Sequence, residues 1–105
     1  MNWRRVARAS DVPPGSARRV VLDGLEIALC NLRGEFFAVD DVCTHAYASL
    51  SEGELIGDQL ECPLHGGCFD VRTGHALGGI VTEDLRRFAV RVEGDDVLIA
   101  LGEGR

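Results

Sequence analysis

Lysine is the most evident absence from this sequence: all eleven basic side chains are arginines, set against seventeen acidic residues. The formal net charge of −6 argues against a nucleic-acid-binding protein, because binding phosphates requires a concentrated positive surface. The charge is compatible with steering toward a basic face on another protein. It is equally compatible with a charge that only keeps the chain soluble.

Long apolar runs are also absent. No stretch approaches the roughly 20 consecutive apolar residues of a membrane-spanning helix. Arg4 and Arg5 resemble the start of a twin-arginine export signal, but no apolar segment follows them. We therefore expect a cytoplasmic protein that does not enter a membrane. Repeats, linkers and low-complexity segments are missing too, so 105 residues with 46% apolar content predict a single domain over residues 1–105.

The residue pattern favours strands over most of the chain. Apolar runs at 20–22 and 25–30 flank Asp23-Gly24, which is the strongest short hairpin signal. Further strand-like runs lie at 36–39, 88–92 and 97–101. The only helical element that we expect is a short turn around residues 10–12.

Residues 40–79 differ from this pattern, because they are rich in Gly, Cys and His and show weak periodicity. The contrast predicts an all-β protein, with an antiparallel β-sandwich base that carries a loop-built subdomain over about residues 40–79. The acidic pair Asp40-Asp41 at the start of this stretch is expected to be a solvated turn.

Two short motifs in the middle stretch supply metal-ligand chemistry. Cys43-Thr44-His45 is Cys-x-His, and Cys62-Pro63-Leu64-His65 is Cys-x-x-His, with sixteen residues between His45 and Cys62. Four cysteines could form two disulfides, but in a cytosolic chain metal or catalytic roles come first. Each motif offers one thiolate and one imidazole. In an iron–sulfur cluster the thiolates would hold one iron and the neutral imidazoles the other, which raises the potential relative to an all-cysteine cluster.

A structural zinc site uses the same four ligand types. The familiar zinc motifs, however, pair Cys with Cys and His with His, whereas the order here is Cys-His-Cys-His. A β-module in which zinc staples two loops therefore remains an alternative that the ligand order disfavours.

At these two motifs the sequence resembles the Rieske iron–sulfur domain, and in particular the small ferredoxins of multicomponent aromatic-ring dioxygenases. The likeness extends to Leu50-Ser51-Glu52-Gly53, Phe69-Asp70 and Arg72-Thr73-Gly74. It implies one [2Fe–2S] cluster, with Cys43 and Cys62 on the inner iron. His45 and His65 would hold the outer iron, with their ring edges exposed at the tip of the subdomain.

The resemblance implies an electron carrier. Single electrons would come from an NAD(P)H-dependent reductase and leave to a terminal oxygenase through transient contacts at the His45/His65 tip, and a carrier of this kind is expected to be a monomer. An oxygenase would need a second iron site with two histidines and a carboxylate. Only His75 remains outside the motifs, so we do not expect an enzyme. The small Rieske-like subunit of an NAD(P)H-dependent nitrite reductase is the alternative.

High-potential Rieske proteins resemble this chain but place serine and tyrosine hydroxyls near the cluster sulfurs, where Gly67 and Phe69 stand here. Each missing hydroxyl removes a hydrogen bond that would stabilise the reduced cluster. The expected potential is therefore near the low end of the Rieske range, about −150 mV rather than about +300 mV. Related ferredoxins often carry prolines in the loop that covers the cluster, whereas residues 76–80 contain none.

The other cysteines and the third histidine are expected to have no ligand role. Cys30 lies in an apolar strand and is predicted to pack as a small hydrophobic residue. Cys68 is interpreted as a loop thiol, and His75 as a solvent-exposed turn residue.

Overall fold

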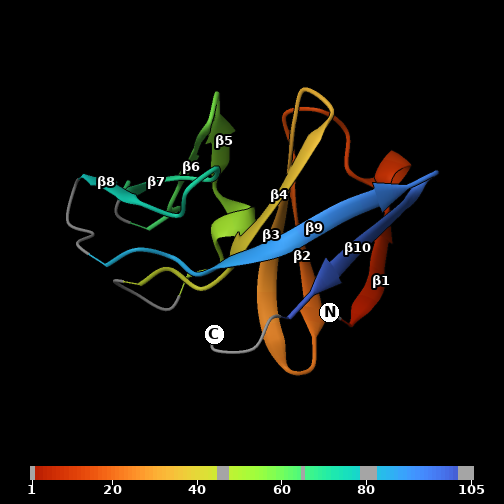
Figure 1. The fold of residues 1–105 in the computed structure, drawn as a ribbon. Coiled ribbons are helices and arrows are strands. Elements are labelled where there is room, and N and C mark those ends of the chain that lie inside the picture. Colours follow the sequence, from red (N-terminus) through yellow and green to blue (C-terminus); the bar gives the residue numbers. More distant parts are fainter. Residues whose placement is uncertain (1, 45–47, 65, 79–82, 102–105) are drawn as a thin grey trace.

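The computed structural model describes residues 2–44, 48–64, 66–78 and 83–101. Within these ranges the chain forms ten strands and two 3-10 helices, and the strands make two antiparallel sheets (Figure 1). The predicted all-β fold is confirmed. The two predicted histidine ligands, His45 and His65, lie outside the described residues.

The larger sheet is the base of the molecule, with strand order β1-β10-β9-β4-β3-β2. It contains β1 (Trp3–Arg8), β2 (Ala17–Leu22), β3 (Leu25–Leu32), β4 (Glu35–Asp40), β9 (Arg87–Glu93) and β10 (Asp96–Ala100). Two residue pairs, Ala38 with Phe88 and Val39 with Arg87, join β4 to β9. The sheet thus consists of two three-stranded halves, β1-β10-β9 and β4-β3-β2, whose buried side chains share one core as in the predicted sandwich.

Two tight turns shape the second half. Asp23 and Gly24 both have positive φ, at 52° and 81°, and join β2 to β3 where Leu22 pairs with Leu25. Arg33 and Gly34, at 53° and 96°, join β3 to β4 in the same way. Two consecutive positive φ values give the turn whose twist matches a hairpin, so the hairpin predicted at Asp23-Gly24 is confirmed.

Side chains from both halves fill the base. Strand alternation directs one face of each strand inward, and the segment after helix η1 (Ala9–Asp11) adds Val12, which is fully buried. The carbonyl of Val12 accepts a hydrogen bond of 2.7 Å from Asn31 Nδ2. This core contains Val20, Leu22, Ile27, Leu29, Ala38, Phe88, Val97 and Ile99.

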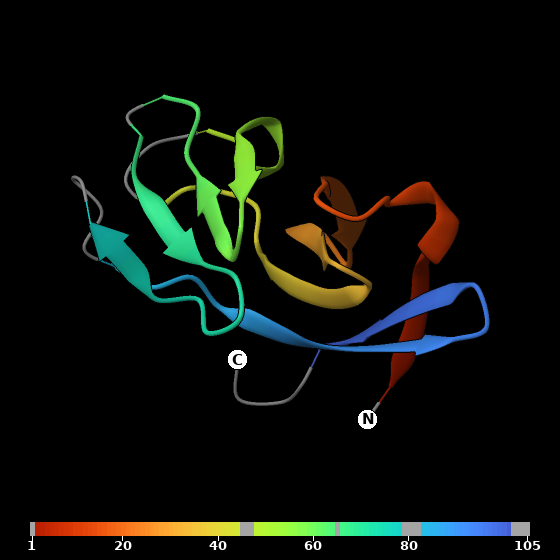
Figure 2. The same ribbon diagram turned by 90° about the horizontal axis from the view of Figure 1, so that it is seen from above.

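The chain between β4 and β9 forms the subdomain. It contains helix η2 (Leu50–Glu52) and a four-stranded sheet, in the order β5 (Glu54–Ile56), β6 (Gln59–Glu61), β7 (Cys68–Asp70) and β8 (Ala76–Gly78). The two views show this sheet gathered at one end of the molecule, beside the base (Figures 1 and 2). The subdomain that was predicted to be built from loops therefore contains a small sheet. Its three-residue strands are too short to show a hydrophobic period in the sequence.

Gly74 fixes the subdomain to the strand that returns to the base. Its N–H donates to the Asp70 carbonyl and its own carbonyl accepts from Leu85 N–H, each over 2.7 Å. With φ at 81°, a Cβ added at Gly74 would lie 2.5 Å from the Leu85 carbonyl oxygen. Gly24 has the same φ of 81°, but a Cβ there would meet nothing within 4 Å.

We therefore predict that Gly74→Ala lowers the free energy of unfolding by about 1–3 kcal/mol more than Gly24→Ala, because only the former adds a backbone clash to the shared positive-φ cost. Chemical denaturation of the two holoproteins, followed by circular dichroism, measures the difference. Equal losses in the two variants would contradict the close approach of Gly74 to Leu85.

Candidate metal centre

Each predicted cysteine ligand opens a short loop that is closed by a backbone hydrogen bond. Cys43 follows β4, and its N–H donates to the Ala48 carbonyl over 3.0 Å. Cys62 follows β6, and its N–H donates to the Gly67 carbonyl over 2.7 Å. In both cases the carbonyl belongs to the residue five positions later. The two motifs therefore form loops of the same span, with the cysteine at the base of each loop.

Both cysteine side chains are buried in one core. Cys43 is 4% and Cys62 is 2% exposed, and they share a cluster of buried residues with Leu50, Leu60 and Phe69. That cluster also includes Ala28, Cys30, Leu32 and Val39 from β3 and β4. All four cysteines of the chain are described, and none forms a disulfide. The structure thus brings together the two thiols of the predicted ligand set at the junction of the two sheets.

The ligand set itself is only half described, because His45 and His65 lie outside the described residues. Within the described residues there is no group of three or more Cys, His, Asp or Glu side chains that could hold a metal ion. The donor chemistry at the two loop bases fits an iron–sulfur group, because buried thiols are soft ligands that bind iron as thiolates.

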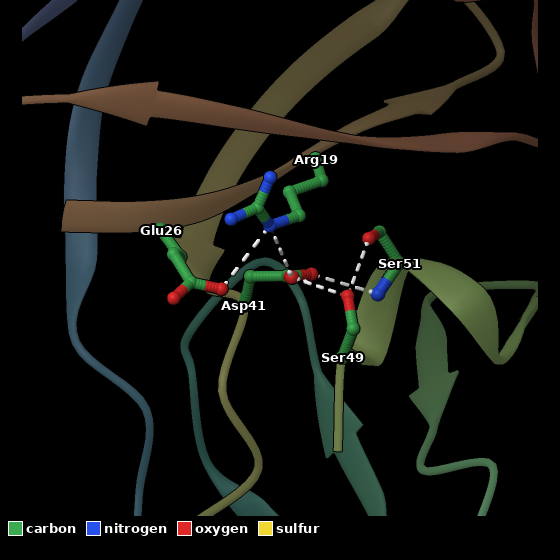
Figure 3. Close-up of polar contacts among 5 residues, drawn as sticks. All are labelled: Arg19, Glu26, Asp41, Ser49 and Ser51. Carbon is green, nitrogen blue, oxygen red and sulfur yellow. Dashed lines mark hydrogen bonds and ion pairs between the residues drawn. The ribbon is translucent and has the colours of Figure 1, made fainter. Parts of the chain in front are cut away.

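The position of Asp41 corrects one of the sequence predictions. This residue was expected to be a solvated turn residue, but its side chain is fully buried. Its carboxylate accepts a hydrogen bond from the Ser49 hydroxyl and one of 2.8 Å from Ser51 N–H (Figure 3). Its backbone carbonyl accepts from Leu50 N–H over 2.7 Å. Asp41 therefore ties the strand that enters the first loop to the segment that leaves it.

Asp40 is also not a simple solvated residue. Its carboxylate accepts from the backbone N–H of Arg86 over 2.8 Å and forms an ion pair of 2.9 Å with the Arg86 guanidinium. Asp40 thus links the end of β4 to the segment that precedes β9. The two adjacent aspartates hold the two ends of the subdomain, one at the first predicted ligand loop and one at the segment that leads into β9.

Cys30 packs in the core as predicted, but Cys68, which was interpreted as a loop thiol, is the first residue of strand β7. Cys30 is fully buried and packs in the core that contains both predicted cysteine ligands. Burial, and secondarily the nearby negative charge of Asp41, raises the pKa of the Cys30 thiol to about 12. At neutral pH Cys30 is therefore a protonated, unreactive thiol. The Cys68 side chain is partly exposed, with its Sγ 3.6 Å from the Gly66 carbonyl oxygen.

His75 is exposed, as predicted, but it has a partner. Its Nδ1 lies 2.9 Å from Asp84 Oδ2, and the other Asp84 oxygen accepts from Ala76 N–H over 2.8 Å. The hydrogen bond from Ala76 and then that from His75 lower the pKa of the Asp84 carboxyl. The neighbouring Glu83 carbonyl accepts from the Thr44 hydroxyl over 3.0 Å. Residues 83–84 thus contact the first predicted ligand loop and β8.

Two antiparallel sheets and two matched loops, each with a buried cysteine at its base, define the class of small β-protein to which this chain belongs. The model of the Rieske [2Fe-2S] domain matches residues 2–100. The chain belongs to the Rieske [2Fe–2S] family, and its cofactor is a Rieske-type [2Fe–2S] cluster.

Named relatives are similar over nearly their whole length. The ferredoxin component of the naphthalene 1,2-dioxygenase system of Pseudomonas aeruginosa is 41% identical, with 94% of this chain and 95% of the relative covered. The biphenyl dioxygenase ferredoxin subunit of Pseudomonas sp. (strain KKS102) is 44% identical, with 94% and 92% covered.

Two solved structures are also similar to this chain over most of its length. A chain in the complex of reduced oxygenase and oxidised ferredoxin of carbazole 1,9a-dioxygenase is 44% identical, with a TM-score of 0.88 and coverage of 93% of this chain and 92% of that chain. A putative small subunit of an NADPH nitrite reductase has a TM-score of 0.82 at 22% identity, covering 96% of this chain and 100% of that one. The latter likeness supports the fold alone.

Proposed function

We propose that the chain is the ferredoxin component of an aromatic-ring dioxygenase system, which carries one electron at a time from an NAD(P)H-dependent reductase to a terminal Rieske oxygenase. The observation that carries this proposal is the pair of buried thiols, Cys43 and Cys62, at the bases of two matched loops in one core. The similarity to dioxygenase ferredoxins over almost the whole chain supports the same function.

The proposed ligands are Cys43, His45, Cys62 and His65. The bound cluster would supply one-electron redox chemistry. The buried cysteines would hold it on the inner side, since each is fixed by the hydrogen bond at its loop base. Each histidine follows its cysteine by two or three residues within the same closed loop.

We expect Cys62→Ser to lose the cluster, because a hydroxyl is a poor substitute for a buried thiolate ligand. Cys68→Ser is the matched control, since it changes a partly exposed thiol six residues away and should retain the cluster. Iron analysis and the visible absorption spectrum of the purified proteins measure the outcome. Retention of full iron content by Cys62→Ser would exclude Cys62 as a ligand.

A carrier without its own substrate site suits this chain, for which we propose a single domain over residues 1–105 and a monomeric, cytoplasmic protein. With His45 and His65 assigned to the cluster, His75 is the one remaining histidine of the sequence. A mononuclear iron site with two histidines and a carboxylate therefore has no second histidine. No helix in the part of the chain that the structure describes meets the length and hydropathy of a membrane span.

The surroundings of the second loop support a low potential. Gly67 has no side chain, and Phe69 fills the core with an aromatic ring that is fully buried and carries no hydroxyl. These are the positions where high-potential relatives place hydroxyl donors.

We predict a midpoint potential of about −150 mV, at the low end of the Rieske range, because few hydrogen bonds stabilise the reduced cluster. Potentiometric titration of the purified protein measures this value. A midpoint well above zero would be incompatible with a shuttle to a dioxygenase of the proposed kind.

Charge is distributed unevenly between the two parts of the molecule. Residues 41–84 contain eight acidic residues and one arginine, a net charge of −7, whereas the remainder contains nine acidic residues and ten arginines, a net charge of +1. Glu52, Glu54, Glu83 and Asp84 of the acidic part are exposed. The subdomain that holds the two ligand loops therefore attracts basic partner surfaces, and the base does not.

We expect the rate of electron transfer to a cognate oxygenase to fall as ionic strength rises, because salt screens this attraction. Glu54→Gln should weaken the salt dependence. Asp11→Asn, an exposed residue of the base, should leave it unchanged. Stopped-flow rates at several salt concentrations measure these slopes. Rates that stay flat from low to high salt would rule out electrostatic steering.

A further inference from the structure

The Asp41 carboxylate is a buried charge that its surroundings only partly neutralise. The side chain has no exposed surface. Among the described residues, its one ion-pair partner is the Arg19 guanidinium, whose Nε lies 3.9 Å from Asp41 Oδ2. The same Nε donates to Glu26 Oε1 over 3.1 Å (Figure 3). The Arg19 guanidinium thus interacts with two carboxylates, and these three side chains together carry one excess negative charge.

This excess charge lies beside the ligand loops. Asp41 is two residues before Cys43, and its carboxylate and carbonyl accept hydrogen bonds from the segment 49–51 that follows the first loop. Leu50 in that segment packs in the core with Cys43 and Cys62. After the larger effect of burial, the Asp41 charge also raises the pKa of Cys30 in that core. A charge is screened little at a site shielded from water.

We propose that Asp41 is a positioning residue that also sets the reduction potential: its hydrogen bonds fix the ends of the first ligand loop, and its buried negative charge disfavours electron uptake. The inference rests on the proposed function, because it needs a cluster at the ligand loops. Each reduction adds one negative charge to the site, so a fixed negative charge nearby lowers the potential. Asp41 thereby adds to the low potential expected from the missing hydroxyl donors.

Asp41→Asn tests the charge with little change of shape. The amide oxygen can still accept from Ser51 N–H, and the amide nitrogen can donate to the Ser49 hydroxyl. We expect the equilibrium constant for reduction to rise about tenfold, equivalent to about 59 mV for one electron. Asp23→Asn is the matched control. It makes the same change in net charge at an exposed turn of the base, where Asp23 pairs with Arg4, and should leave the midpoint unchanged.

Arg19→Gln tests a change of charge in the opposite direction and leaves the Asp41 side chain itself unaltered. It removes the partial neutralisation of Asp41 and should lower the midpoint. Its control is Arg18→Gln, since Arg18 is the exposed neighbour on β2 and points to the opposite face of the strand. A purely structural role of Asp41 would lower the stability of the Asp41→Asn protein without producing midpoint shifts of opposite sign.

Potentiometric titration of the five cluster-loaded proteins decides the question. Upward and downward shifts for Asp41→Asn and Arg19→Gln, with both controls unmoved, would support the proposal. Midpoints equal to that of the unaltered protein would overturn it. If Asp41→Asn fails to bind the cluster, the sign of the Arg19→Gln shift relative to Arg18→Gln decides instead. Absence of a cluster in the unaltered protein would refute the proposed function rather than this inference.

Discussion

The burial of two thiols in one shared core is the constraint on which the rest of the structure depends. Cys43 and Cys62 come from segments that follow different strands, yet both side chains are buried among residues of β3, β4 and the subdomain. The packing that joins the two sheets is therefore the same packing that places the proposed ligands. A change that separates the sheets would also separate the thiols.

Short-range signals made much of the fold predictable. The hairpin turn at Asp23-Gly24 needs two positive φ values, and Asp-Gly is one of the residue pairs preferred in such a turn. The short helical turn after β1 was also predicted near its observed position at Ala9–Asp11. Cys43 and Cys62 were predicted as ligands from their spacing to the following histidines, and the structure places both thiols in one core.

Longer-range contacts could not be read from the sequence. Asp41 was predicted to be solvated because nothing near it in the sequence indicates its partners. Ser49 and Ser51 lie eight and ten residues further on, and Arg19 comes from another strand. The pairing of His75 with Asp84 spans nine residues across β8 and was missed for the same reason. Such contacts become visible only when the sheets are assembled.

The electron paramagnetic resonance spectrum of the dithionite-reduced protein, recorded with iron and zinc analysis, tests the central claim most directly. A rhombic spin-half signal with an average g below that of all-cysteine clusters is expected, with the two irons of a [2Fe–2S] group in each chain. It would establish mixed Cys/His ligation at the two loops. A silent spectrum with one zinc per chain would contradict the electron-transfer function and leave a zinc-stapled β-domain.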